Sequence, residues 1–420
     1  MFTFIHAADI HLDSPMHKLE AYDGAPVEQF RLSTRRALEN LVELAVSQTV
    51  SFVLISGDLY DGDWKDYNTG LYLISRMNRL KEAGIPVFIV SGNHDAASAI
   101  TKTLRMPDNV TVFSSSRPET CTLDDPAVAI HGRSFRSAAE KKDLSKDYPA
   151  PLPGRFNIGM LHTCATGRPG HEPYAPCTPE GLAQKDYQYW ALGHVHQHEI
   201  LSENPCIVFP GNTQGRHIRE SGPKGCVLVT VSDEMEITSD FMPTDVVRWC
   251  RIRVDASAAN EPYEVVSSFA EQLESALSEN NGMPLALRAE ITGETRAAAE
   301  LTSDPERWTG EIRAAAMEAG NGLAWVEKVE ISCTLPPDLR HPPAGGAIEE
   351  LLNLFDELED NPEAGQELAD ELSDLCRKLP RELKQYPDGI RCDDPDWINE
   401  LLKQVRPELL GRLMRKGDSA

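Results

Sequence analysis

The sequence predicts a layered α/β fold for residues 1–245, followed by a small α+β unit and a helical tail. Two observations predict the first part. Short apolar runs of strand length alternate with segments in which apolar residues recur every three or four positions, as on one face of a helix. Each run ends directly in a short cluster containing Asp, Asn or His. Loops that follow strands meet at one edge of such a sheet, so the clusters are expected to lie together.

Five apolar runs supply the strands before the clusters: 2–5, 52–55, 87–90, 158–161 and 189–192. The intervening helices are expected at about Val27 to Ser47 and Thr69 to Ala83, where apolar residues follow helical spacing. Gly84 and Pro86 then terminate the second helix. The first 245 residues therefore form one domain of alternating strands and helices.

The character of the chain changes near Met242-Pro243. Strand-like and helical segments then alternate without any cluster of catalytic type, which predicts a small α+β domain. A linker containing Pro342-Pro343 follows, and leucine stripes at helical spacing predict a C-terminal helical segment. These stripes fit two arrangements, packing onto the chain's own domains or docking on a partner. The predicted divisions are 1–245, 246–335 and 347–420.

Composition excludes several classes of protein. Hydrophobic residues make up 41% of the chain and charged residues 25%, as in ordinary globular proteins, and no apolar run has the length of a membrane span. The N-terminus carries neither a basic region nor a cleavage signal, so export is not expected. The nine cysteines are scattered and never form Cys-x-x-Cys, which suggests neither a disulfide framework nor a thiolate zinc site. We expect a cytoplasmic protein.

The net charge of −25 argues against a simple nucleic-acid binder. Affinity for a polyanion comes mainly from Lys and Arg, and the chain has 41 of these against 66 carboxylates. If DNA is the substrate, the isolated chain should bind it weakly, and metals or a partner must supply much of the attraction.

The clusters suit a pair of divalent cations. They are Asp9-x-His11, Gly57-Asp58, Gly92-Asn93-His94-Asp95, His162 and Gly193-His194-Val195-His196. Two cations about 3.5–4 Å apart need a shared carboxylate. Asp58 is the candidate bridge, because Gly57 lets the backbone turn sharply. Asp9 and His11 are expected on an extended segment, both facing one side. Imidazole and oxygen ligands without thiolate favour Mn²⁺ or Fe²⁺ over Zn²⁺ or Mg²⁺.

Taken singly, each cluster has a structural explanation. An isolated Asp-x-His or Gly-Asp is usually a turn or a cap, and a lone histidine such as His162 is more often hydrogen-bonded within a core. The set in this order predicts a dinuclear site. The pattern resembles that of the calcineurin-like metallophosphoesterase superfamily. Within it, the stretches 6–15 and 210–217 resemble the SbcD/YhaO-type DNA repair exonucleases.

The resemblance implies a core of two packed β-sheets flanked by helices, with a small capping domain and a C-terminal helical segment. It also implies which residues would hold each metal. One metal would take Asp9, His11, Asp58 and His196, and the other Asp58, Asn93, His162 and His194. His94 is similar to the catalytic histidine of the family, and Asp95 would orient it. A water between the metals would then attack phosphorus in line.

Other positions are less specific. Gly62 stands where the phosphoprotein phosphatases of the superfamily place an Arg, which counts against a Ser/Thr phosphatase. Asp61 receives no assigned role. Arg216 and His217 are candidates for contacting substrate phosphates, but a solvated turn explains them nearly as well.

The resemblance implies a Mn²⁺-dependent 3′–5′ exonuclease with some endonuclease activity in DNA repair or end processing. Its C-terminal helices would dock on an SbcC-like coiled-coil ATPase, and a homodimer is possible. One alternative is a phosphoesterase of small diesters such as cyclic nucleotides, which the acidic charge favours. Another is a non-catalytic scaffold, which would have no need of the complete ligand set and His94.

Overall fold

The computed structural model of the chain divides into two compact units. The first comprises Met1–Cys250 and Met283–Ala286, and the second comprises Arg251–Gly282 and Leu287–Ala420. The structure describes residues 1–14, 32–61, 67–97, 105–165, 174–336, 347–361, 364–379, 390–392, 394–402 and 405.

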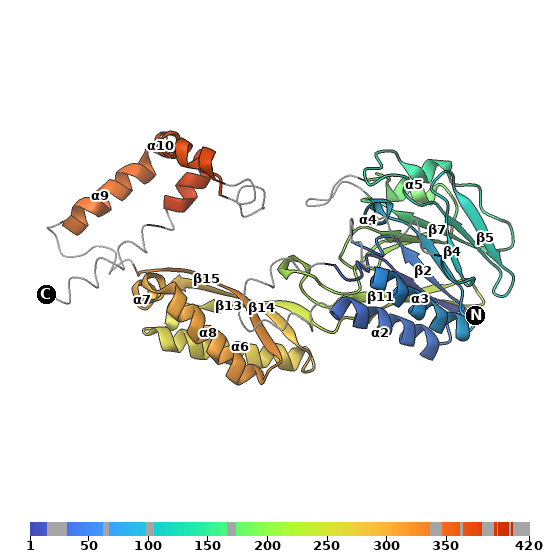
Figure 1. The fold of residues 1–420 in the computed structure, drawn as a ribbon, viewed down its shortest axis with the longest axis horizontal. Coiled ribbons are helices and arrows are strands. Elements are labelled where there is room, and N and C mark those ends of the chain that lie inside the picture. Colours follow the sequence, from blue (N-terminus) through green and yellow to red (C-terminus); the bar gives the residue numbers. More distant parts are fainter. Residues whose placement is uncertain are drawn as a thin grey trace. The chain divides into compact units, whose positions relative to one another are not determined.

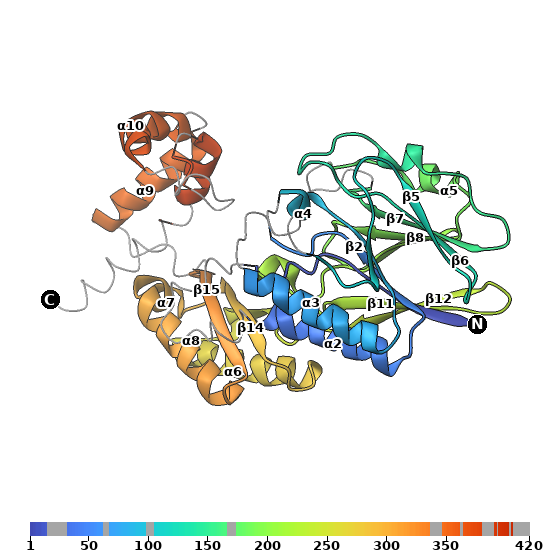
Figure 2. The ribbon, with the colours of Figure 1, turned by 45° about the vertical axis from the view of Figure 1, so that its right-hand side comes forward.

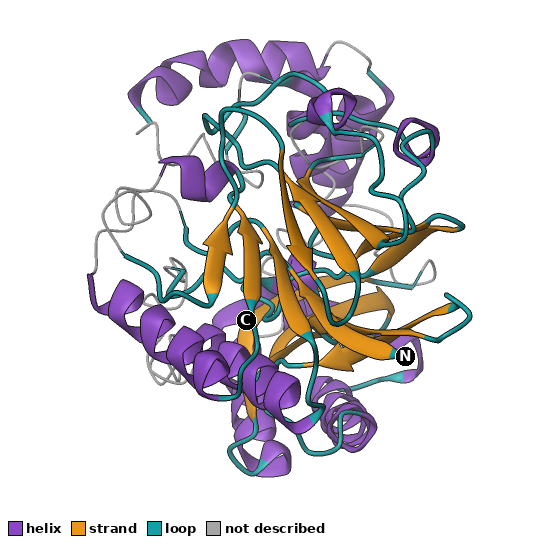
Figure 3. Ribbon diagram, turned by 90° about the vertical axis from the view of Figure 1, so that its right-hand side faces the viewer, coloured by secondary structure: helices purple, strands orange, loops and turns teal. Residues whose placement is uncertain are grey.

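Two six-stranded sheets form the first unit (Figures 1 and 3). The strands of the first sheet are β1 (Phe2–Ala7), β2 (Phe52–Ser56), β3 (Val87–Val90), β4 (Val110–Val112), β11 (Gly225–Val231) and β12 (Ile237–Pro243). Those of the second are β5 (Glu119–Leu123), β6 (Val128–Gly132), β7 (Phe156–His162), β8 (Tyr189–Gly193), β9 (Glu199–Glu203) and β10 (Cys206–Phe209). Their orders are β12-β11-β1-β2-β3-β4 and β5-β6-β7-β8-β10-β9. Strands β1 to β4 are parallel, as are β6, β7, β8 and β10.

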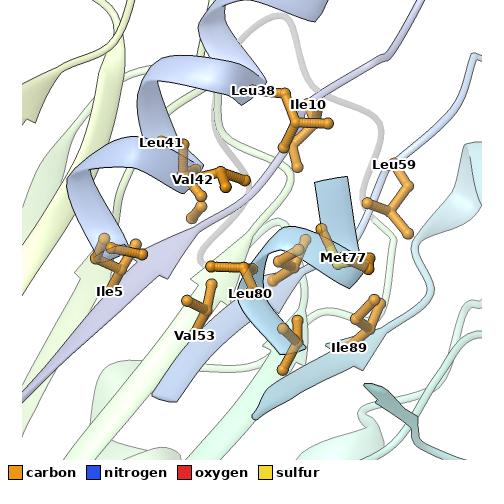
Figure 4. Close-up of a cluster of buried hydrophobic side chains, with 14 of the residues drawn as sticks. Ile5, Ile10, Leu38, Leu41, Val42, Val53, Leu59, Met77, Leu80 and Ile89 are labelled. Atoms are coloured by element: carbon orange, nitrogen blue, oxygen red, sulfur yellow. The ribbon is translucent and has the colours of Figure 1, made fainter. Parts of the chain in front are cut away.

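The two sheets pack face to face over a core of aromatic and aliphatic side chains. Phe4 and Phe52 lie in this core with Phe156 of the other sheet. Because side chains alternate along a strand, Ile5 and Val53 lie on the opposite face of the first sheet. There they pack against the helices α2 (Ser33–Ser47) and α3 (Tyr67–Glu82), as Figure 4 shows. Figure 2 shows the two helices next to each other in the ribbon.

The outer face of the second sheet is covered by a separate apolar cluster. Trp190 and Leu192 of β8 pack there with Leu182 of the short helix α5 (Pro179–Ala183). Other helical turns in the described part of the unit are α4 (Asn93–Ala97), η2 (Leu144–Asp147) and η3 (Ile218–Glu220). The layers therefore run helix, sheet, sheet, helix, and the predicted α/β class with two packed sheets is confirmed. Residues 27–31 of the first expected helix lie outside the described residues.

His6 is a buried polar link between the two sheets. Its Nε2 donates a hydrogen bond to the carbonyl oxygen of Leu192 (3.0 Å), so Nδ1 accepts one from the Tyr189 hydroxyl (3.0 Å). Both bonds need the neutral imidazole, because a protonated Nδ1 cannot accept. Burial lowers the pKa of His6 to about 3, although the hydrogen bond to Leu192 opposes this.

The link predicts a stability that depends on pH. The unfolded chain takes up a proton on His6 below its ordinary pKa of 6.5, whereas the folded protein does not until about pH 3. The stabilisation is therefore complete above pH 6.5 and is lost as the pH falls toward 3. From pH 7 to 5 we expect His6 alone to lower the free energy of unfolding by about 2 kcal/mol. Urea unfolding of the wild type and His6→Gln, which cannot titrate, checks this; equal pH dependence in both would contradict it.

The second unit contains a three-stranded sheet in the order β13-β14-β15. Its strands and helices are β13 (Arg248–Asp255), η4 (Ala256–Ala258), α6 (Pro262–Glu279), β14 (Leu285–Glu294), α7 (Ala298–Ser303), α8 (Pro305–Gly320) and β15 (Ala324–Thr334). Phe269 and Leu273 of α6 are buried, as are Trp308 and Ile312 of α8. The expected alternation of strands and helices after residue 245 is therefore present.

The tail contains α9 (Ala347–Asp360) and α10 (Ala364–Lys378), with a further helical stretch at 395–402. Cys376 of α10 forms a disulfide with Cys392, and both are buried with Ala369 and Ile398 in a small apolar cluster. The scattered cysteine spacing gave no reason to expect this disulfide, because only the folded chain brings together two cysteines that are 16 positions apart. Among the described residues no helix is both long and apolar enough to cross a bilayer.

Candidate metal centre

The predicted ligand residues lie at the ends of β1, β2, β3, β7 and β8, or in the loops and the short helix α4 that follow these strands. Hydrogen bonds join these loops. The backbone N–H of His11 donates to the carbonyl oxygen of Asp58 (3.0 Å). The carboxylate of Asp9 accepts from the N–H of His194 (2.9 Å), and that of Asp58 accepts from the N–H of His94 (3.0 Å). Residues 185 positions apart are thereby fixed in one network.

Two motif glycines allow the close approach of these loops. A Cβ atom on Gly57 would lie 2.3 Å from Nδ1 of His162, and the φ of Gly57 is +98°. A Cβ on Gly193 would lie 1.9 Å from the carbonyl oxygen of Ser56. Both distances are far below van der Waals contact. The glycines before Asp58 and His194 are therefore required by the space between strands as well as by the turn.

The backbone of the ligand residues corrects one expectation. Asp9 and His11 are not on an extended segment, because their φ angles are 51° and 44°. Asp58 and His194 also have positive φ angles, 53° and 101°. This left-handed region is unfavourable for residues with a side chain and is found where a surrounding structure enforces it, often at functional sites. The side chains converge through tight turns and not through strand alternation.

The ligand atoms form two main groups: Asp9, His11 and His196 in the first, and Asp58, His162 and His194 in the second. Within each group, one ligand atom per residue lies within 4.8 Å of the others. Asp58 Oδ2 is 3.9 Å from His11 Nε2 and 3.4 Å from His162 Nε2. Asp58 thus lies between the groups, and it also forms a group with His11 and His94. Asn93 Oδ1 joins the second group, 2.9 Å from His162 Nε2.

Hydrogen bonds on the far side of two histidines set their tautomers. Nδ1 of His162 donates to the carbonyl oxygen of Ser56 (2.9 Å), and Nδ1 of His196 donates to Glu220 Oε1 (2.7 Å). Each ring therefore keeps Nε2 available as a ligand atom. Glu220 had no assigned role from the sequence, although it lies in the same stretch as Arg216.

Burial and charge fit divalent cations at this place. Oδ1 of Asp9 is buried and has no hydrogen-bond partner in the part of the chain that is described. Burial raises the pKa of the Asp9 carboxyl. Burial also raises that of Asp58, but the charges and hydrogen bond of the neighbouring histidines, His162 foremost, together outweigh burial and hold the pKa of Asp58 well below its usual range. A bound cation would stabilise both carboxylates in the charged form, so the residues fit two metal ions.

The contacts of His94 differ from the expectation. The carboxylate at its Nδ1 is that of Asp61, at 2.9 Å. Asp95 lies at the start of α4, and its carboxylate accepts from the backbone N–H groups of Gly92 (3.0 Å) and Tyr60 (3.1 Å). The amide of Gly92, just before the helix, has no partner within the helix, so the carboxylate turns back to it. The contact that we expected from Asp95 is made by Asp61.

Arg216 and His217 lie beside the first ligand group. The guanidinium of Arg216 is 3.2 Å from Glu220 Oε1 and 3.6 Å from Asp61 Oδ2, and its side chain is 15% exposed. His217 is more open, with its side chain 52% exposed, and lies 3.5 Å from the same oxygen of Glu220. Arg216 thus belongs to the network around His196, and a solvated turn does not describe it. His217 is at the rim.

Comparisons with known proteins agree with this geometry. Residues 2–198 match the family model of the calcineurin-like phosphoesterases, and residues 249–334 match that of the middle domain of the metallophosphoesterase YhaO. The chain is 34% identical to the uncharacterized metallophosphoesterase YhaO of Bacillus subtilis (strain 168) over 297 residues, which are 69% of this chain and 72% of that protein. The chain belongs to the calcineurin-like metallophosphoesterase family. Members of this family are metal-dependent hydrolases of phosphoesters, so membership makes this chain a metal-dependent phosphoester hydrolase.

More distant similarity extends to proteins named DNA double-strand break repair protein Mre11. The Methanopyrus kandleri protein is 27% identical over 228 residues, covering 50% of this chain and 48% of that protein. The Sulfurisphaera tokodaii protein is 26% identical over 210 residues, covering 47% of this chain and 49% of that protein. The chain spans about half the length of these Mre11 proteins.

The bond between Glu220 and His196 predicts a defect in metal binding. Glu220→Gln keeps the size of the side chain but removes the charge that holds Nδ1–H of His196. Loss of such an outer partner typically weakens metal binding 10–100-fold, and we expect about that loss of Mn²⁺ affinity. Calorimetric titration of the metal-free protein measures it. Glu234→Gln, at an exposed turn, is the matched control, and equal affinity in both variants would contradict the role.

Proposed function

We propose that this protein is a metal-dependent nuclease that hydrolyses DNA phosphodiester bonds, as a 3′–5′ exonuclease with some endonuclease activity, in DNA repair or end processing. The observation that carries the proposal is the pair of ligand groups around Asp58 with His94 beside them. The similarity to proteins named for DNA break repair supports DNA as the substrate. We propose Mn²⁺ as the metal, because the donors are imidazole and oxygen without thiolate.

The residues divide the chemistry among them. Two divalent cations, when bound, lower the pKa of a water molecule and offset charge on the phosphate. Asp9, His11, Asp58 and His196 would hold one, and Asp58, Asn93, His162 and His194 the other. Asp61 accepts from Nδ1–H of His94 and fixes the ring, so that Nε2 can carry a proton to the departing oxygen. Arg216, close to His196, is placed to bind a phosphate oxygen.

A phosphodiesterase of small substrates is the second candidate. The net charge of −25 favours it, since long DNA would be repelled by most of the surface. The same residues serve both activities, because each cleaves a phosphodiester. Only the groups that bind the rest of the substrate separate the two.

We also propose that the tail at 347–420 docks on a coiled-coil ATPase in the cytoplasm, and that the protein forms homodimers. Exposed apolar side chains on the tail support docking: Leu354 of α9 is 50% exposed and Leu375 of α10 is 54% exposed. A partner that covers these leucines would bury apolar surface that the chain leaves in water.

The test is a parallel assay of the purified chain with Mn²⁺ on end-labelled duplex DNA and on a chromogenic phosphodiester. Progressive shortening of the DNA, absent in His94→Ser, is the expected result. Hydrolysis of the small diester alone leaves two readings, and adding a candidate coiled-coil ATPase to the same reaction decides between them. If DNA stays intact with the ATPase present, the nuclease proposal is wrong and the small-diester activity stands.

A further inference from the structure

A pocket opens beside His196 in the first unit. Its volume is about 660 Å³, within the range that holds small-molecule ligands. The lining comes from the segment after β8, the segment around η3 and strand β12. His196 belongs to the first ligand group, so the pocket extends directly from the proposed metal centre. Most of its lining residues lie outside the two ligand groups.

One part of the lining is cationic. Arg216, Arg219 and Lys224 line the pocket, and Glu220 is the one carboxylate among the lining residues. This excess of positive charge is unusual in a chain with a net charge of −25. Lys224 is buried and its Nζ donates to the carbonyl oxygen of His196 (2.7 Å). Nε of Arg216 is buried without a hydrogen-bond acceptor among the described residues. These donors suit the phosphate of a ligand.

Another part of the lining is aromatic. The rings of His198 and Phe241 lie with their centroids 5.0 Å apart and their planes at 31°. Nδ1 of His198 donates to the carbonyl oxygen of Phe209 (3.1 Å), which fixes the ring. Both rings are partly exposed. Planar groups of this kind form stacking surfaces for nucleic-acid bases.

We propose that this pocket binds the nucleotide next to the phosphodiester that is cleaved, with its phosphate on the cationic side and its base against Phe241 and His198. Cationic and aromatic lining together select a nucleotide as the ligand class. Inorganic phosphate alone would make no contact with the aromatic rings, and an apolar ligand would leave the cationic side chains without a partner. The inference rests on the proposed function, since it takes the substrate to be a nucleic acid. It adds a site that distinguishes a nucleotide diester from other diesters.

The test measures binding to the full-length chain without metal. The probes are 2′-deoxyadenosine 5′-monophosphate, inorganic phosphate and 2′-deoxyadenosine, each followed by calorimetry or by ligand-observed NMR. The monophosphate should bind at least tenfold more tightly than either fragment. Phe241→Ala should weaken the monophosphate about tenfold and phosphate little. Arg219→Ala should weaken both.

Two further variants make the comparison secure. Phe241→Leu keeps an apolar side chain on β12 and should lose affinity for the monophosphate while retaining the melting temperature. Arg79→Ala, on an exposed part of α3, is the control for loss of an arginine. If Phe241→Leu and Arg219→Ala bind the monophosphate as the wild type does, the inference is wrong. It is equally wrong if the wild type binds phosphate as tightly as the nucleotide.

These outcomes are separate from the fate of the proposed function. DNA cleavage with Mn²⁺ tests the function, whereas nucleotide binding is measured without metal. Cleavage of DNA with unaltered nucleotide binding in both variants would overturn the pocket assignment alone. Nucleotide binding that needs Phe241 and Arg219, in a protein that leaves DNA intact, would overturn the nuclease proposal and keep the pocket.

Discussion

Replacing Asp58 by asparagine is expected to abolish phosphodiester hydrolysis and to remove metal ions from both positions. Oδ2 of Asp58 lies between His11 and His162, and its Oδ1 accepts from the N–H of His94. Asparagine keeps the shape but removes the negative charge that two adjacent dications share. We expect hydrolysis to fall by at least about 10³-fold, the loss of several kcal/mol of transition-state stabilisation. Metal content should fall from two ions per chain to fewer than one.

Metal content measured by mass spectrometry after gel filtration, beside hydrolysis of the chromogenic diester, tests this. Asp108→Asn makes the same chemical change at a carboxylate whose side chain is 78% exposed and pairs with Lys81. That control should retain both ions. Two bound ions in Asp58→Asn would show that another group joins the metals, and Asp58 would lose the bridging role.

Replacing His94 by serine is expected to separate catalysis from metal binding. His94 is hydrogen-bonded through Nδ1 to Asp61, and its side chain is 39% exposed, so it can meet a substrate. Loss of a residue that moves a proton in the transition state typically costs 10²–10⁴-fold in rate, and we expect kcat to fall by about that factor. The content of bound metal should stay at two ions per chain, because the main ligand groups remain.

The pair of measurements on His94→Ser is decisive in either direction. A loss of metal in proportion to the loss of rate would make His94 a ligand, in keeping with its group with His11 and Asp58. Asp61→Asn offers a second check, because it leaves His94 in place but alters its partner. If Asp61 only positions the ring, this variant should lower kcat less than His94→Ser does and should shift the pH at which activity is highest.

Much of the site could be predicted from residue types and their places along the chain. Strands that are buried on both faces, such as β2 (Phe52–Ser56), are recognisable in the sequence as apolar runs. The position of Asp58 directly after that run places it at the carboxyl edge of a parallel sheet. The order of the motifs also resembles that of the family, which the match over residues 2–198 and the 34% identity to YhaO bear out. These features depend on local sequence, so no knowledge of the folded chain is needed.

Partners that depend on distant segments could not be predicted. The sequence pointed to Asp95 as the partner of His94 and assigned no role to Asp61. In the structure the carboxylate of Asp95 is instead bonded to the amides of Gly92 and Tyr60. The left-handed φ angles of Asp9 and His11 depend on the loop after β2, to whose Asp58 the N–H of His11 is bonded. Hydrophobic periodicity predicts on which face of a helix or strand a side chain lies, but it does not predict the backbone conformation of the loops.

The α/β class, the candidate metal-ligating residues and the edge of the sheets at which they lie could be predicted from the sequence alone. The hydrogen-bond partners of three histidines, in contrast, followed only from the tertiary structure. Glu220 binds His196, Asp61 binds His94, and His6 joins the two sheets through Tyr189 and Leu192. The physical reason is that secondary structure follows from local periodicity, whereas a hydrogen bond needs two groups within about 3 Å, which only packing of distant segments provides.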